Sequence, residues 1–258
     1  MSLASTLRDT RLIFRRQLRL SLRNPAWLII GVIQPILYLA LFGPLVKHFV
    51  SAPGASSDQA WRIFVPGLLV QLGLFGSLFV GFAIIAEWRA GVIERMRVTP
   101  VSRFALLFGR VLRDMIALLV QSAILVLTGL LMGLRAPIGG VLFALAFIAV
   151  LAISMSSLSY AVGLALKSED SLAPLLNSVA VPVLLLSGIL LPITRQSAPS
   201  WLYYLSRINP FRYVVDAMRE VFVGNYADLT VLWGSLISLV LAIVCIMLGV
   251  RRFQIESA

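Results

Sequence analysis

Few residues of this 258-residue sequence are suited to covalent or acid–base catalysis. Cys245 is the one cysteine, which excludes an internal disulfide and a thiolate metal cage, and His48 is the one histidine. The two lysines, Lys47 and Lys167, do not belong to a phosphate-binding loop of the form G-x-x-x-x-G-K-[ST]. A serine-nucleophile motif, G-x-S-x-G, is also absent from the sequence. We therefore expect no catalytic, metal or cofactor site in this chain.

Charged residues with a regular spacing occur in the segment 87–103. Glu87 and Glu94 lie seven residues apart, so they share a face if the segment is one helix. An apolar patch adjoins that face and consists of Val92, Ile93 and Met96. Thr99-Pro100 is typical of a helix N-cap followed by proline at the first helical position. This pattern predicts a short exposed helix that docks in a partner's groove. Flanking positive charge, the simpler interpretation, accounts for the arginines but for neither glutamate.

The composition requires a membrane environment for these residues. Hydrophobic residues make up 60% of the chain, charged residues 13%, and the mean hydropathy is +0.96. These values exclude a soluble enzyme, and long unbroken apolar runs exclude a membrane β-barrel. Since about 20 helical residues cross the hydrocarbon layer, six spans are predicted, at 27–46, 63–86, 115–134, 140–166, 172–191 and 229–250. We expect an all-α polytopic membrane protein with a single transmembrane domain, residues 1–258.

The distribution of cations predicts the orientation of these spans. Of the 22 lysine and arginine residues, 15 fall on the side of the two termini and 7 on the other side. Cytoplasmic loops carry an excess of cations, so both termini are expected in the cytoplasm. These membrane-flanking cations also account for the net charge of +11, so we expect no nucleic-acid partner.

The segment before the first span, residues 1–25, is amphipathic. Leucines recur on one helical face and arginines run beside it. We expect an interface helix in the headgroup layer, with its cations facing anionic lipid. A solvated basic tail is the alternative.

The loop 192–228 is too polar to span a membrane and too apolar for a plain linker. It contains two amphipathic pieces separated by Asn209-Pro210, because proline interrupts a helix. In the second piece, Asp216 lies within pairing distance of Arg212 and Arg219 on one face. We expect two short helices that lie at the outer interface or re-enter the bilayer. An ordinary surface loop is the alternative.

Small residues within the spans predict close helix packing and one bend. The expected packing faces contain Gly129 and Gly133 in the third span, and Ser154 and Ser157 in the fourth. Ser187-Gly188 is expected to end the fifth span in a bend.

Several motifs resemble those of one family of transport proteins. The segment 87–103 resembles the cytoplasmic motif of the ATP-binding-cassette type-2 exporter permeases, in the pattern Glu87-x-x-x-Gly91-x-x-Glu94-Arg95-x-x-x-Thr99-Pro100-x-Ser102-Arg103. Further segments are similar in the same order: Val65-Pro66-Gly67, Leu186-Ser187-Gly188-Ile189, Trp201-Leu202, Asn209-Pro210 and Val214-x-Asp216-Ala217-x-Arg219. Within that family the chain most resembles the daunorubicin-resistance-type drug-efflux permeases.

The resemblance implies a mechanism and a set of partners. Two permease chains, expected to be a homodimer, would each dock on a cytoplasmic ATPase subunit that binds ATP and magnesium. The coupling residues would be Glu87, Gly91, Glu94, Arg95, Thr99 and Pro100. The outer gate would contain Ser187, Gly188, Asn209, Pro210, Asp216 and Arg219. The complex would export amphiphilic drugs or lipids across a bacterial plasma membrane, without an ATPase site in this chain.

Two other functions remain open at this point. A polysaccharide or lipo-oligosaccharide exporter would share the architecture but needs aromatic residues along its channel. The five tryptophans lie mostly near the predicted interfaces, which favours an apolar cargo. A non-transport membrane scaffold would bind no ATPase.

Overall fold

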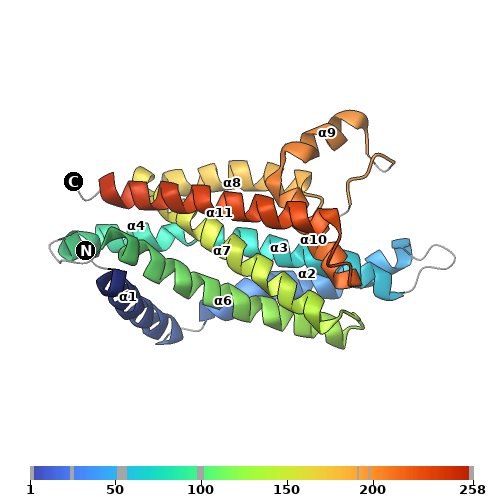
Figure 1. Cartoon of the computed structure of the whole chain (residues 1–258), viewed down its shortest axis with the longest axis horizontal. Coiled ribbons are helices and arrows are strands. Elements are labelled where there is room, and N and C mark those ends of the chain that lie inside the picture. Colours follow the sequence, from blue (N-terminus) through green and yellow to red (C-terminus); the bar gives the residue numbers. More distant parts are fainter. Residues whose placement is uncertain are drawn as a thin grey trace.

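The computed structural model describes residues 3–23, 26–50, 57–97, 102–190, 192–196 and 198–255, and these residues contain no β-strand. In chain order the helices are α1 (Leu3–Arg23), α2 (Ala26–Val50), α3 (Ser57–Leu78), α4 (Gly81–Arg89), α5 (Val92–Arg97), α6 (Arg103–Leu131), α7 (Ile138–Leu166), α8 (Glu169–Leu186), α9 (Ser200–Ile208), α10 (Pro210–Val223) and α11 (Leu229–Ile255). The long helices lie side by side in one bundle (Figure 1).

Five helical stretches of the described residues are long and apolar enough to cross a membrane. They are Asp58–Arg89, which combines α3 and α4, and the helices α6, α7, α8 and α11. A shorter apolar stretch, Ile29–Leu41, lies in α2, where the first span was predicted. The predicted all-α polytopic fold is therefore confirmed. Two predicted spans extend beyond their helices, because α6 ends at Leu131 and α8 ends at Leu186.

The two ends of the bundle differ in what they carry. Both termini lie at one end, together with α4 and α1, and we call this the terminal end (Figure 1). The helices α9 and α10 lie toward the opposite end, which we call the far end (Figure 1). The two predicted functional regions are thus separated by the length of the membrane-crossing helices.

The predicted second span, 63–86, is interrupted in its second half. Helix α3 ends at Leu78 and α4 begins at Gly81. The hydroxyl of Ser159 on α7 accepts a hydrogen bond from the Gly81 amide at 2.9 Å and donates one to the Leu78 carbonyl. One side chain therefore satisfies two backbone groups that the interruption frees, as a break at membrane depth requires. The apolar run predicts the span but not this interruption within it.

The small residues of α6 and α7 have different roles. Ser154 and Ser157 are fully buried, and an added Cβ at Gly249 of α11 would lie 3.1 Å from the Ser157 carbonyl oxygen. Close packing is thus observed along α7. Gly129 packs near Val65 of α3, but Gly133 lies beyond the end of α6 with a φ of +105°. The predicted continuous Gly129–Gly133 face is wrong, because Gly133 ends the helix in a left-handed conformation.

Helix α1 packs along the first half of α6. A Cβ added at Gly109 of α6 would lie 2.7 Å from the Ile13 side chain, so this glycine permits the contact. Thr10 and Gln17 are buried on the packed face, whereas Leu7 and Leu22 are 70% and 66% exposed. The exposed leucines belong to the face that is predicted to lie in the headgroup layer.

The predicted helices of the loop 192–228 form at the expected places. Asn209 separates α9 from α10, and Gly224 ends α10 with a φ of +101°. Helix α10 packs against α3, α7 and α11, and its buried residues include Val214, Ala217, Met218, Val221 and Phe222. A plain surface loop is therefore excluded for α10, which is an integral part of the bundle.

Candidate functional site

The predicted coupling segment is divided into two short helices. Helix α4 ends at Arg89, and α5 begins at Val92. Gly91 lies between them with a φ of +66° and has no atom within 4 Å of an added Cβ, so backbone conformation and not space requires glycine here. Glu87 and Glu94 consequently lie on different helices, and their predicted shared face is wrong. Arg95 on α5 is exposed, and the Glu94 side chain lies outside the described part of the structure.

The N-cap of the following helix also differs from the prediction. Helix α6 begins at Arg103, and the hydroxyl of Ser102 accepts a hydrogen bond from the Ala105 amide at 3.1 Å. Ser102 is therefore the cap, because its side chain satisfies an amide of the first turn. Thr99 and Pro100 lie outside the described residues.

Glu87 joins three helices and does not project freely into solvent. Its carboxylate accepts hydrogen bonds from the Arg110 guanidinium of α6 at 2.5 Å and from the Gln17 amide of α1 at 3.0 Å. Arg110 is 3% exposed and also donates to the Leu106 carbonyl at 2.7 Å. We call Glu87, Arg110 and Gln17 the three-helix clamp, because it fixes the end of α4 to α1 and α6.

A second polar cluster lies close to this clamp along α6. Asp114 is 2% exposed; it accepts a hydrogen bond from the Tyr160 hydroxyl of α7 at 2.5 Å and lies 2.9 Å from Arg113. Sequence reasoning missed this cluster because it placed Asp114 outside the third span. The available signal was the four-residue spacing of Arg110 and Asp114, which places both on one face of α6.

The end of α4 also contacts the connection between α7 and α8. Arg89 forms an ion pair with Glu169 at 3.2 Å, and the Lys167 ammonium lies 5.1 Å from the centre of the Trp88 ring. Both contacts are at the surface, where such pairs are individually weak. Together with the clamp, they link α4 to α1, α6 and the start of α8.

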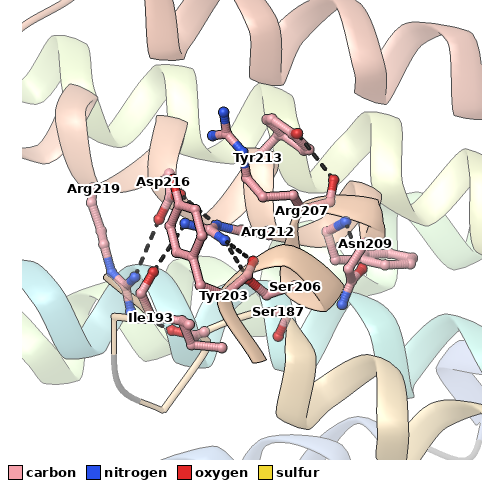
Figure 2. Close-up of polar contacts among 12 residues, drawn as sticks. Ser187, Ile193, Tyr203, Ser206, Arg207, Asn209, Arg212, Tyr213, Asp216 and Arg219 are labelled. Atoms are coloured by element: carbon pink, nitrogen blue, oxygen red, sulfur yellow. Dashed lines mark hydrogen bonds and ion pairs between the residues drawn. The ribbon is translucent and has the colours of Figure 1, made fainter. Parts of the chain in front are cut away.

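At the far end, Arg219 of α10 connects three segments of the chain (Figure 2). Its guanidinium donates to the Gly188 carbonyl at 2.7 Å and to the Ile63 carbonyl of α3 at 3.2 Å. Gly188 follows α8 in a left-handed conformation with a φ of +71°. The predicted partner, Asp216, is present but more distant, with an N–O distance of 3.5 Å. Burial lowers the pKa of Arg219 to about 10, and the nearby Asp216 carboxylate opposes this shift.

Arg212 makes a similar set of contacts about two turns earlier on α10 (Figure 2). It donates to the Ile193 carbonyl at 2.9 Å, to the Tyr203 carbonyl at 3.3 Å and to the Ser206 hydroxyl, and Asp216 lies 3.5 Å away. Burial raises the pKa of Asp216, although Arg219 and then Arg212 lower it in part. Both arginines are therefore held mainly by hydrogen bonds to backbone carbonyls. The spacing of residues in the sequence could not predict these bonds.

The remaining predicted gate residues stabilise the start of α10 and the bend that follows α8. The Asn209 side chain accepts from the Phe211 amide at 3.0 Å and donates to the Val183 carbonyl of α8 at 2.7 Å, while Pro210 occupies the first helical position. Ser187 accepts from the Ile189 amide at 3.3 Å, which stabilises the bend after α8. The predicted gate residues are thus brought together at the far end.

The described residues thus form a polytopic helical bundle with a short charged helix at one end and a pair of short helices at the other (Figure 1). The chain belongs to the ABC-2 type transporter family, whose sequence profile matches residues 8–223. It is therefore a membrane-spanning subunit of an ABC transporter.

The chain is also similar to several transport permeases. The ycf38 protein of Cyanophora paradoxa, named as a transport permease, is 30% identical over 202 residues, covering 78% of this chain and 69% of ycf38. The daunorubicin resistance ABC transporter permease protein DrrB1 of Streptomyces coeruleorubidus is 28% identical over 203 residues, covering 78% and 70%. YbhR of Escherichia coli K12, named as a multidrug ABC transporter permease, is 23% identical over 181 residues, covering 69% and 48%.

Proposed function

We propose that this chain is the permease subunit of an exporter that moves amphiphilic drugs or lipids out of the cytoplasm or the inner leaflet of a bacterial plasma membrane. Two copies would form a homodimer, and each would dock on a cytoplasmic ATPase subunit that supplies the ATP and magnesium site. The terminal end of the bundle would then face the cytoplasm. The names of the drug-resistance relatives support this cargo class.

The three-helix clamp is the observation that carries this proposal. A segment that transmits force from an ATPase must be fixed to the helices that it moves. Glu87 fixes the end of α4 to buried Arg110 at 2.5 Å, directly before helix α5, on which Arg95 is exposed and Ile93 is buried. A force applied to α5 would therefore act on α1, α4 and α6 together, because the clamp prevents the end of α4 from bending as a free loop would.

The structure offers a continuous route from α4 to the far end. Helix α4 follows α3 after the interruption at Leu78, and α3 carries the Ile63 carbonyl that accepts from Arg219. Gly67 of α3 would place an added Cβ 2.1 Å from the Ile189 carbonyl oxygen, so α3 also touches the turn after α8. In this mechanism, movement of α3 opens the outer turns.

A glycan or lipo-oligosaccharide cargo is the second candidate, favoured by one feature of the far end. Tyr203 and Tyr204 have ring centroids 5.6 Å apart, and the Arg207 guanidinium lies 5.8 Å from the centre of the Tyr203 ring. Tyr204 is 62% exposed, and an exposed aromatic ring can stack on a sugar. Trp61 and Trp88 give no such support, since Trp61 is 2% exposed and Lys167 lies over the Trp88 ring, but Trp201 on the same helix as the two tyrosines is 67% exposed.

The decisive experiment is reconstitution of the chain with its ATPase in proteoliposomes. ATP-dependent movement of daunorubicin or of a fluorescent phospholipid is expected, and a hydrolysis-deficient ATPase provides the control. Transport of an undecaprenyl-linked glycan but of neither apolar probe would favour the second candidate. Failure to bind any ABC ATPase would favour the scaffold alternative.

A further inference from the structure

A groove of about 570 Å³ lies between α7, α8 and α11 at the terminal end of the bundle. This volume is in the range of small-molecule sites, roughly 300–1,000 Å³. Its wall is apolar and is formed by side chains that include Leu158, Ala161, Leu166, Leu175 and Leu248. All three helices are candidate membrane spans, so the groove opens toward the hydrocarbon layer. A hydrocarbon chain is the ligand chemistry that fits these walls.

The rim of the groove is cationic. Arg251 and Arg252 line it from the last turns of α11, and both are exposed. Within the described part of the chain, neither arginine forms a hydrogen bond or an ion pair. Glu169, at the start of α8, is already paired with Arg89 at 3.2 Å. The two guanidinium groups are therefore free to bind an anion at the level of the headgroups, where arginines at the ends of spans place their charge.

From this arrangement we infer that the groove binds an anionic phospholipid of the leaflet at the terminal end. One acyl chain lies against α7, α8 and α11, and the lipid phosphate binds Arg251 and Arg252. Arginine suits this role because its planar group donates two parallel hydrogen bonds to phosphate oxygens. Basic pockets between membrane helices are a known way to bind anionic headgroups. The inference does not depend on which molecule the assembled transporter exports.

Lipid titration of the purified full-length chain in detergent tests this inference. Native mass spectrometry counts the bound phosphatidylglycerol and phosphatidylcholine molecules, and the wild-type chain is expected to retain one phosphatidylglycerol in preference to phosphatidylcholine. The R251Q/R252Q variant should bind phosphatidylglycerol about 30-fold more weakly, if each arginine contributes as a cation near an anionic membrane surface does. The matched control is R135Q/R207Q, which removes two exposed cations from the far end and should bind as the wild type does.

A second variant tests the groove and not the charge. Ala165 lines the groove and is exposed, so A165W fills the space while both arginines remain. It should also lose the bound phosphatidylglycerol. Equal binding of both lipids by the wild type, or unchanged binding by R251Q/R252Q or by A165W, would overturn the inference. A change of oligomeric state in these variants at unchanged lipid affinity would overturn it too, since a second chain would then cover the groove.

Discussion

Arg219 of α10 and Gly188 after α8 are joined by a hydrogen bond of 2.7 Å, although 31 residues separate them in the chain. The same guanidinium reaches Ile63 of α3 at 3.2 Å. Because Gly188 has a φ of +71°, its carbonyl turns in a direction that regular helix would not allow. This one side chain therefore holds the far-end turn against two helices.

The first prediction concerns the relative importance of Arg219 and Asp216. Arg219→Met should destabilise the protein by about 1–3 kcal/mol, because buried carbonyls lose their donor. Asp216→Asn should have a smaller effect, since the Asp216 side chain is 37% exposed and its ion pairs measure 3.5 Å. Thermal unfolding of both variants in detergent provides the comparison. A larger loss for Asp216→Asn would mean that the ion pairs, and not the carbonyls, hold Arg219.

The second prediction concerns the contact between α3 and the turn after α8. Gly67→Ala should lower stability and transport, because its Cβ would lie 2.1 Å from the backbone oxygen of Ile189. Gly73→Ala is the matched control on the same helix, since its Cβ would lie 3.3 Å from a flexible Ile148 methyl group. Equal melting temperatures for the two variants would show that α3 can move away from the turn without cost.

The sequence predicts the helices well where one signal dominates. Long apolar runs identified the spans, and Asn209-Pro210 identified the start of α10, because proline restricts the backbone locally. It also predicted the pairing of Asp216 with its arginines from helical spacing alone.

The contacts between distant segments could not be read in this way. Glu87 was interpreted as a docking residue because its partners, Arg110 and Gln17, lie 23 and 70 residues away. Gly133 was interpreted as a packing residue although a glycine in a left-handed conformation is itself a common end of a helix. The interruption after Leu78 depends on Ser159, which lies on another helix. At Glu87 and at the interruption, tertiary contacts decided the outcome, whereas at Gly133 the local backbone conformation did.

The third prediction concerns the interruption between α3 and α4. Ser159→Ala removes the hydroxyl that satisfies the Gly81 amide and the Leu78 carbonyl, and should cost about 1–3 kcal/mol for the buried groups left unpaired. Ser154→Ala is the control on the same helix, because the Ser154 hydroxyl donates only to the Val150 carbonyl of its own helix at 2.6 Å. Unfolding in detergent compares the two. Similar losses would indicate a general effect of removing a buried hydroxyl.

The fourth prediction concerns orientation. In a Cys245→Ser background, cysteine is introduced at Ala227 at the far end or at Arg95 on α5, and both positions are exposed. An impermeant thiol reagent added to intact cells should label position 227 and spare position 95, because the cation excess places the terminal end in the cytoplasm. Permeabilised cells, in which both positions should react, provide the control. The reverse pattern in intact cells would contradict the proposed direction of export.

The last prediction separates two roles within the coupling segment. Glu87→Gln should lower stability by about 1.5–3 kcal/mol, because Arg110 is 3% exposed and would lose its charged partner. It should also reduce ATP-dependent transport, even when the ATPase still binds. Glu94→Lys, on α5 beyond Gly91, should leave the melting temperature unchanged and weaken binding of the ATPase. Both variants are compared by thermal unfolding, by co-purification with the ATPase and by transport in proteoliposomes.

The double variant Glu87→Gln/Arg110→Gln should recover part of the stability lost by Glu87→Gln, because the unpaired buried charge is gone. If Glu94→Lys instead unfolds the protein and Glu87→Gln does not, the clamp is not what fixes α4, and the proposed transmission of force through Glu87 is wrong.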